Sequence, residues 1–425
     1  MHMENQAGQP RGMDRRGDVG WPVLALVLAA ITFNGFLAII NAHVTTLGFW
    51  DVAAAEIFIL FLGLLVILVK GIRAGQVAVF LFLIFTLGMA AYVTLINKQL
   101  YIDYFRNILI LSIFCMLGYY VNAATLKKVV LWSVSIVFGV LMLEVFYLNQ
   151  YGDLFYPAKY FEDTRGLEQI SLDGTKLFQN AQRVPGRFTF GIINHRSSSI
   201  FLEQVSNANF SGVLMIYLIA LWKRFSAMQL GFILATIILI ILTNDTRTMI
   251  LFSVICLTGY FVFPKLPRLF ALMVMPLVLI AGGMIYLLMP DAVGDNIPGR
   301  IVLTITKFGE LSLPDVLGFA AETAPAQADS GYIYVIVIGT IFSLILLWLF
   351  VSFYPRCGSA AERRYAHALS IFIFMNLLIG GTAIFSIKIA ALLWLLAGHL
   401  ARGETVSENA ETEEMRHLNH PIPAR

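Results

Sequence analysis

Arginines gather at two places in this otherwise apolar sequence, and both places are candidates for binding an anion. The first is a polar segment ahead of an apolar stretch, with Arg165, Arg183, Arg187, His195 and Arg196. The second is a very short turn between two apolar stretches, Asn244 to Thr248, which contains Arg247. A guanidinium held beside a membrane offers phosphate oxygens a planar fork of N–H donors. The turn therefore predicts contact between Arg247 and an anionic lipid headgroup, and the arginine-rich segment is a further functional candidate.

Ionisable residues inside apolar stretches are a further set of candidates. They are Glu56, Asp103, Arg106, Glu144, Arg247 and Lys388. Charges at membrane depth are costly unless they are paired or face water. Asp103 and Arg106 are three residues apart on one helix face, so they either pair or bind a ligand. For Glu56 and Glu144 the alternative is snorkelling or a structural hydrogen bond. For Lys388 it is an ion pair across helices, and for Arg247 a salt bridge to Asp245.

The composition excludes most soluble classes. Of 425 residues, 59% are hydrophobic and 13% charged, whereas a soluble chain carries roughly 25% charged residues. The net charge is +3, and Lys and Arg are dispersed in pairs between apolar stretches. This pattern does not indicate a nucleic-acid-binding protein. Three cysteines give no disulfide framework. No GxxxxGK[ST], HExxH, CxxC or Asp-x-Asp motif occurs, so we expect no metal and no cofactor.

Apolar blocks of about 20 residues, long enough to cross a hydrocarbon layer of about 30 Å, set the fold class. We predict an all-α polytopic integral membrane protein with about twelve transmembrane helices. The predicted spans are 21–42, 52–70, 75–96, 101–121, 129–150, 206–222, 228–243, 247–263, 268–289, 330–353, 364–381 and 384–400. Residues 21–400 then form a single transmembrane domain, 1–20 are a cytoplasmic tail and 401–425 a disordered cytoplasmic tail.

Basic residues predict the orientation. Every second short loop carries Lys or Arg: Lys70 and Arg73, Lys127 and Lys128, Lys223 and Arg224, Lys265 and Arg268, then Arg356, Arg363 and Arg364. The positive-inside rule places these loops and both termini in the cytoplasm. Two long segments, about 151–205 and 290–329, then fall outside. The second contains Arg300, Lys307, Asp315, Glu322 and Asp329. Long connections of this kind are functional candidates, a solvated loop with ordinary surface charge being the alternative.

Several segments resemble one family in the same order along the chain. Arg196 to Phe210 reads RSSSIFLEQVSNANF, and the turn around Arg247 reads NDTRT. Asp329 to Tyr332 reads DSGY ahead of IYVIVIG, and Tyr101 to Asn107 reads YIDYFRN. Together with the two long outer loops, these elements resemble bacterial polysaccharide polymerases of the Wzy type and their O-antigen-ligase relatives. The resemblance covers about a third of the chain.

The resemblance implies glycosyl transfer at the outer face of the bacterial inner membrane. The substrate would be a polyprenyl-diphosphate-linked oligosaccharide, and the product an exopolysaccharide or O-antigen-like polymer. Arginines would stabilise the charge that grows on the departing diphosphate, without a divalent metal. Arg196 and Arg247 are the first choices, with Arg187 and Arg300 as partners. Besides the lipid bilayer, a chain-length regulator and a flippase would be the protein's partners.

The acceptor hydroxyl needs a base or an orienting acceptor, for which the sequence offers Glu203 or His195. A surface histidine is the alternative for His195. Substrate-binding roles are expected for Asp329, Tyr332 and Arg106. The ring and hydroxyl of Tyr332 suit a sugar, and aromatic packing is the alternative.

Three other functions stay open from the sequence. An O-antigen ligase would use the same chemistry on a different acceptor. A lipid-oligosaccharide flippase or transporter should show internal repeats and broken helices, but residues 21–222 and 228–400 show no repeat. A non-catalytic membrane component is the third. Neighbouring genes for glycosyltransferases, a flippase and a chain-length regulator would favour the polymerase.

Overall fold

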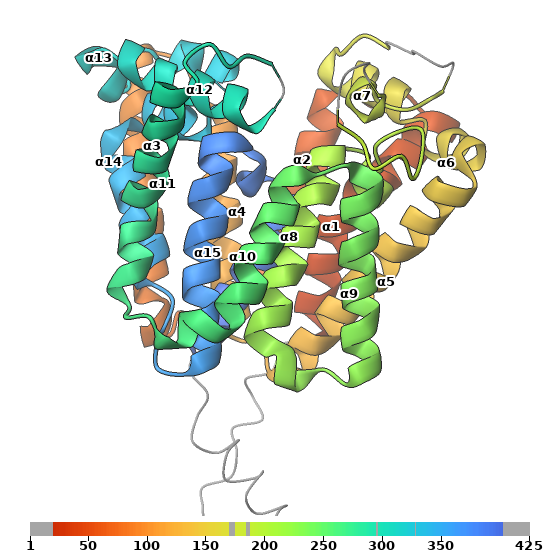
Figure 1. The fold of residues 1–425 in the computed structure, drawn as a ribbon, viewed down its shortest axis with the longest axis horizontal. Helices are drawn as coiled ribbons and strands as arrows, with labels where there is room; N and C mark the ends of the chain where they lie inside the picture. Colours follow the sequence, from red (N-terminus) through yellow and green to blue (C-terminus); the bar gives the residue numbers. More distant parts are fainter. Residues whose placement is uncertain (1–19, 170–174, 184–187, 295, 328, 403–425) are drawn as a thin grey trace, which may run out of the picture.

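The chain folds as a bundle of α-helices in a computed structural model that describes residues 20–169, 175–183, 188–294, 296–327 and 329–402 (Figure 1). No strand occurs in these ranges. The α-helices are α1 (Gly20–His43), α2 (Phe49–Lys70), α3 (Val77–Asn97), α4 (Ile102–Gly118), α5 (Ala123–Phe146), α6 (Leu148–Phe155), α7 (Pro157–Arg165), α8 (Gln204–Leu221), α9 (Ala227–Asn244), α10 (Arg247–Val262), α11 (Leu269–Leu288), α12 (Ile297–Glu310), α13 (Leu313–Val316), α14 (Gly331–Phe353), α15 (Ala360–Ile379) and α16 (Ile387–Ala401). Short 3₁₀ turns are η2 (Ala74–Gln76), η3 (Gln179–Ala181), η4 (Ser199–Phe201), η5 (Trp222–Arg224), η6 (Phe263–Lys265), η7 (Ala321–Gln327) and η8 (Ala383–Phe385).

The chain is a multi-pass membrane protein by the length and composition of its helices. Nine helices of the described ranges are long and apolar enough to cross a membrane, counting η2 with α3, η5 with α8 and η6 with α10. The other three predicted spans are also helices, namely α4, α15 and α16. However, α4 and α16 have 17 and 15 residues, and α15 carries Glu362, Arg363 and Arg364 near its start. The three further membrane spans, which would bring the total to twelve, therefore stay a prediction.

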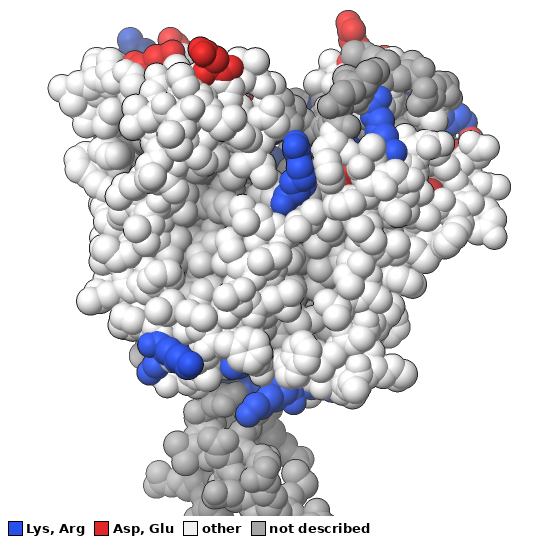
Figure 2. All heavy atoms as spheres, viewed as in Figure 1, with Lys and Arg blue, Asp and Glu red and all other residues white. Residues whose placement is uncertain are grey.

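The side chains that face outward match an apolar solvent. Large apolar residues along the helices are exposed, among them Phe58, Leu81, Phe261, Ile280 and Leu287. Figure 2 shows a broad band of uncharged surface between the two ends of the bundle, with Lys and Arg at one end and both acidic and basic residues at the other. Exposing such an apolar band to water would be unfavourable, whereas contact with lipid acyl chains is not. This arrangement supports the membrane assignment.

The two long connecting segments lie at the same end of the bundle. Figure 1 shows α7 on one side of this end and α12 and α13 on the other. Contacts between turns define the opposite end, where Arg363 donates to the carbonyl of Pro264 at 2.8 Å. His399 also lies 2.8 Å from the carbonyl of Val121 there. We call the two ends the loop end and the basic end. Which side of the membrane each end faces stays a prediction from charge.

Two short helices cross closely near the basic end. A Cβ atom at Gly398 of α16 would lie 1.8 Å from the carbonyl oxygen of Cys115 in α4. A Cβ atom at Gly118 of α4 would lie 2.0 Å from the carbonyl oxygen of Leu395. The two backbones can touch only because both positions are glycine, as in other close helix crossings in membranes.

The length of these helices leaves room at the loop end. At about 1.5 Å per residue, α4 and α16 are only about 25 Å and about 22 Å long, against about 30 Å or more for α1, α2 and α15. Both helices end near the basic end, where their glycines meet. Their opposite ends, at Ile102 and Ile387, line a hollow at the loop end.

Replacing Gly398 by Ala is expected to separate α4 from α16 and to lower stability by about 1–3 kcal/mol or more, because the new methyl group meets backbone that cannot move aside. Gly283→Ala in α11 is the matched control, since a Cβ atom there meets nothing within 4 Å. Thermal unfolding in detergent would measure both variants. Equal melting temperatures for the two would contradict the close crossing.

A single cysteine can report which way the bundle faces. Cys115 and Cys256 are buried, whereas Cys357 in the turn between α14 and α15 is half-buried at the basic end. If the positive-inside rule holds, a membrane-impermeant maleimide labels Cys357 in sealed inside-out vesicles and leaves it unlabelled in right-side-out vesicles. Labelling in right-side-out vesicles alone would reverse the predicted orientation. Cys357→Ser controls for background.

Candidate functional site

The hollow at the loop end is a cavity of about 1240 Å³. Its walls come from α2, α4, α7, α8, α10, α12 and α14, and the start of α16 forms part of its lining. Figure 2 shows the surface hollowed between the two groups of elements at this end. The ionisable residues that line the cavity are Glu56, Asp103, Arg106, Arg165, Arg196, Glu203, Asp245, Arg247, Arg300, Glu322, Asp329 and Lys388.

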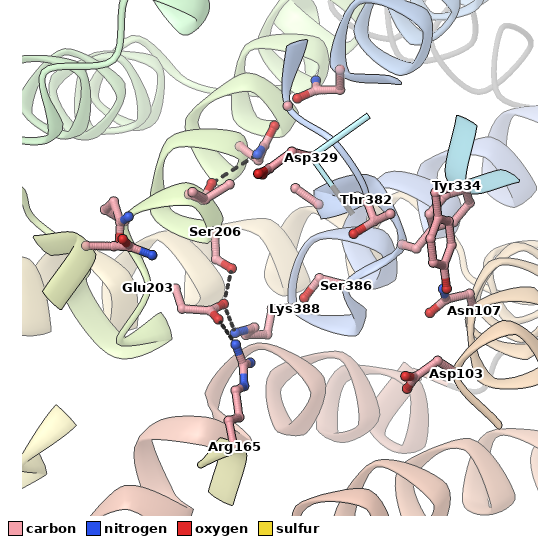
Figure 3. Close-up of a pocket in the computed structure, with 18 of the residues that line it drawn as sticks. Asp103, Asn107, Arg165, Glu203, Ser206, Asp329, Tyr334, Thr382, Ser386 and Lys388 are labelled. Atoms are coloured by element: carbon pink, nitrogen blue, oxygen red, sulfur yellow. Dashed lines mark hydrogen bonds and ion pairs between the residues drawn. The ribbon is translucent and has the colours of Figure 1, made fainter. Parts of the chain in front are cut away.

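One carboxylate joins two cations at the wall of this cavity. The Lys388 ammonium lies 2.7 Å from Oε2 of Glu203, and Arg165 pairs with Oε1 of the same carboxylate (Figure 3). Ser206 donates a further hydrogen bond to Glu203 at 3.0 Å. The Lys388 side chain is only 4% exposed. The expected ion pair of Lys388 across helices is therefore confirmed, and α7, α8 and α16 meet at Glu203.

The protonation state of Glu203 follows from these neighbours. Burial raises the pKa of the Glu203 carboxyl, but the positive charges of Arg165 and Lys388 outweigh burial and hold the pKa below its ordinary value. Glu203 is therefore ionised at neutral pH. A carboxylate held so firmly as an anion is a weak proton acceptor.

Arg196 is fixed by the carboxyl end of α9. Its Nε donates to the carbonyl oxygen of Asn244 at 3.0 Å, and its backbone N–H donates to Ala181 at 2.7 Å. The next residue, Ser197, pairs through its hydroxyl with Thr243 at 2.7 Å. A guanidinium beside unpaired helix-end carbonyls is favourable. Arg196 is 8% exposed and still lines the cavity.

Glu144 anchors the serines that follow Arg196. Its carboxylate accepts the backbone N–H of Ser198 at 3.0 Å and that of Ser199 at 2.6 Å, with a third bond from the Ser198 hydroxyl at 3.1 Å. Ser199 and Leu202 have φ of 50° and 62°, a left-handed backbone that non-glycine residues adopt only when the surroundings enforce it. Glu144 therefore makes the structural hydrogen bonds that the sequence left open for it.

Arg247 begins α10 and lines the cavity without a carboxylate partner among the residues the structure describes. Its guanidinium lies 5.5 Å from the ring centroid of Phe188. Asp245, the suggested partner of Arg247, pairs instead with Arg183 at 2.9 Å and accepts the Phe190 N–H at 2.8 Å. The suggested salt bridge between Arg247 and Asp245 is absent here, and the Arg247 charge remains available to a ligand.

Arg106 is paired in the way its sequence spacing suggests. It lies 3.1 Å from Asp103 in the same helix and 3.3 Å from Glu56 in α2. Beside it, the amide of Asn107 lies 3.4 Å from the Tyr334 hydroxyl. Arg106 therefore combines a structural pair with a place in the cavity wall.

The remaining predicted residues are divided between the cavity and the core. Arg300 donates to the carbonyl of Ile379 at 3.1 Å and lies 4.0 Å from Asp329, and both residues line the cavity. Among the described residues, His195 and Tyr332 are not part of the lining. His195 lies 3.5 Å from Glu144, and the buried Tyr332 hydroxyl donates to Phe374 at 3.1 Å. Arg187 lies outside the described residues.

The sequence did not identify every residue of the cavity wall. Arg165 was one arginine among several, and nothing placed it beside Glu203 and Lys388. Gln204 and Asn209 in the first turns of α8 also line the cavity, and both are 3% exposed. Polar residues at consecutive turns of an apolar helix, on the same side as Glu203, were the available signal. Within the described ranges, no group of His, Cys, Asp or Glu residues could hold a metal ion.

Comparison with known proteins adds no relative. No protein-family model, curated protein or solved structure matches this chain.

The Glu203 pair makes a prediction about stability. Glu203→Gln leaves the Lys388 ammonium buried without its carboxylate, and the expected loss is about 3–5 kcal/mol. The double variant Glu203→Gln, Lys388→Met removes both charges and should recover most of this loss. Thermal unfolding in detergent gives both values. A double variant less stable than Glu203→Gln would contradict the pairing.

Asp103→Asn is the matched control for this experiment. It removes a carboxylate that is 58% exposed, so it should change stability by less than about 1 kcal/mol.

The pH dependence of stability follows from the lowered pKa of Glu203. Its contribution is present above the unfolded-state pKa of about 4.3 and is lost as the pH falls toward the folded-state pKa. The contribution of Glu203 to stability should therefore be constant between about pH 5 and about pH 8.

Proposed function

We propose that this protein is a membrane glycosyltransferase that joins polyprenyl-diphosphate-linked oligosaccharide units into a polymer outside the bacterial inner membrane. One observation carries the proposal. Arg196 and Arg247, which come from separate segments of the chain, line one cavity at the loop end of a multi-pass bundle. The resemblance of the segments around both arginines to Wzy-type polymerases supports the same reading.

The cavity has the parts that such a transfer needs. A volume of about 1240 Å³ accommodates several sugar rings as well as a diphosphate. As the bond between the anomeric carbon and the phosphate oxygen breaks, the acceptor hydroxyl oxygen bonds to the anomeric carbon and its proton passes to water. Negative charge grows on the departing diphosphate. Guanidinium groups fixed beforehand stabilise that charge more in the transition state than in the ground state. Arg196 is fixed by Asn244, and Arg247 adds a charge with no carboxylate partner in the described ranges.

The other candidate residues take different parts in this proposal. Arg300 and Arg106 assist in the cavity wall, and Asp329 lies beside Arg300. Glu203 serves by holding Arg165 and Lys388 rather than as the base, because its pKa is lowered. His195 and Tyr332 support the wall from behind through Glu144 and Phe374.

A transporter is the second candidate, and one observation favours it. α14, whose first half lines the cavity with Tyr334 and Ile338, is interrupted at Thr340, where φ is 72° and ψ is 164°. Broken helices at membrane depth are typical of transporters. An O-antigen ligase would share the cavity chemistry. Purified protein with lipid-linked repeat units, in the absence of nucleotide, distinguishes them: a ladder of products means polymerase, and no bond formation means transporter. Transfer to another acceptor means ligase.

Arg196→Ala and Arg247→Ala are each expected to reduce the ladder by about 100-fold or more, which is the usual loss of a transition-state donor. Both variants should still insert into the membrane at normal abundance. Lys176→Ala is the control, because Lys176 pairs with Asp153 at 2.5 Å outside the cavity. Full-length polymer from both arginine variants would refute the role of the arginines in binding the diphosphate.

A further inference from the structure

A second hollow lies at the basic end of the molecule, away from the cavity. It has a volume of about 440 Å³. It lies between the turn that joins α10 to α11 and the turn that joins α14 to α15, and it is lined by Lys265, Leu266, Pro267, Arg268, Cys357, Gly358 and Arg363. We propose that this hollow binds the phosphate group of an anionic phospholipid.

Its two guanidinium groups are held in place by backbone carbonyls. Arg363 donates through Nε to Cys357 at 2.9 Å and through Nη1 to Pro264 at 2.8 Å, so it ties the two turns together. Arg268 donates to the carbonyl of Phe353, and its guanidinium lies 5.4 Å from the ring centroid of that residue. Fixed guanidinium groups lose little side-chain freedom when they bind an oxyanion.

The positive charge of this hollow is not neutralised from within. In the described part of the chain, no carboxylate lies within ion-pair distance of Lys265, Arg268 or Arg363. The nearby Glu362 is occupied in capping α15, where it accepts the N–H groups of Gly358 at 2.7 Å and Ser359 at 3.1 Å. At the loop end, by contrast, Arg106 and Arg165 have carboxylate partners. The basic hollow therefore has three cations to offer an external anion.

The surroundings favour a lipid over a free phosphate ion. The helices beside the hollow expose large apolar side chains to the membrane, with Phe261 70% exposed on α10 and Leu269 61% exposed on α11. Met273 and Phe353 continue this apolar surface along α11 and α14. A phosphate seated between the two turns would thus have its acyl chains against apolar protein. Basic pockets beside transmembrane helices bind anionic lipid headgroups in this way.

This proposal is independent of the glycosyl-transfer proposal. It requires only that the chain lies in a bilayer and that the two turns hold their cations together. The positive-inside rule assigns the basic residues of the other turns a role in orientation. Lys265, Arg268 and Arg363 would in addition fix the α10–α11 pair against α14 through a bound lipid.

Cys357 provides the reporter for a test. It lines the hollow, and the other two cysteines of the chain are buried. Burial raises the pKa of the Cys357 thiol, so maleimide labelling is followed at mildly alkaline pH. The full chain in detergent is titrated with a short-chain phosphatidylglycerol, with phosphatidylcholine of equal chain length, or with inorganic phosphate. We expect phosphatidylglycerol alone to slow labelling, by about tenfold at a free lipid concentration of about ten times its Kd, because only the unoccupied fraction of the protein reacts.

Matched variants decide whether the hollow is responsible. Lys265→Ala with Arg268→Ala should raise the phosphatidylglycerol concentration that gives half-maximal protection by about 30-fold, the loss of affinity expected for two cations near an anionic headgroup. Lys127→Ala with Lys128→Ala removes the same charge in the first turns of α5, outside the hollow, and should leave protection unchanged. Melting temperatures without lipid confirm that both double variants fold.

Three results would overturn the proposal. Equal protection by inorganic phosphate would identify a free-anion site, and equal protection by phosphatidylcholine would identify detergent-like coverage of the thiol. Protection that survives Lys265→Ala with Arg268→Ala would place the lipid elsewhere.

Discussion

The ion pair between Glu203 and Lys388 determines how the loop end of this protein is built. Lys388 lies at the start of a short helix, where its ammonium is almost completely buried. A lysine there is tolerated only beside an anion, and Glu203 at the start of α8 supplies it. Arg165 then binds the same carboxylate from α7, so three segments far apart in the sequence converge on one residue. The cavity takes its shape from this convergence.

The last part of the long segment 151–205 depends on a second buried carboxylate. Glu144 holds two successive backbone N–H groups, those of Ser198 and Ser199, and the backbone next to them adopts left-handed conformations. Asn244 fixes the guanidinium that precedes them. Arg196 thus reaches the cavity with its orientation already set. Preorganised donors of this kind are what a reaction with a growing negative charge requires.

The sequence predicted the helical bundle well because membrane helices can be recognised as long, continuous apolar stretches. Each of the twelve predicted spans corresponds to a helix. Nine of these helices, within the residues that the structure describes, are long and apolar enough to cross a membrane. α4 ends at Gly118 and α16 begins at Ile387, so both are shorter than predicted, and glycines at positions 118 and 398 let the two helices cross closely. Local hydrophobicity carries no information about such a crossing.

Pairing within the site could be predicted only where partners are close in sequence. Asp103 and Arg106, three residues apart, were a natural pair. For Arg247 closeness in sequence suggested Asp245, two residues before it, but that carboxylate pairs with Arg183 from the long loop. The joining of Arg165, Glu203 and Lys388 depends on how three distant segments pack, and no local pattern encodes it.

The central claim is that Arg196 and Arg247 hold one diphosphate between them. A double-mutant cycle on the affinity for polyprenyl diphosphate, with Arg196→Gln, Arg247→Gln and the double variant, tests it most directly. If both guanidinium groups bind the same diphosphate, each single variant weakens binding and the two losses are not additive, with a coupling of about 0.5–3 kcal/mol. Unchanged affinity in both single variants, or losses that simply add, would contradict the claim.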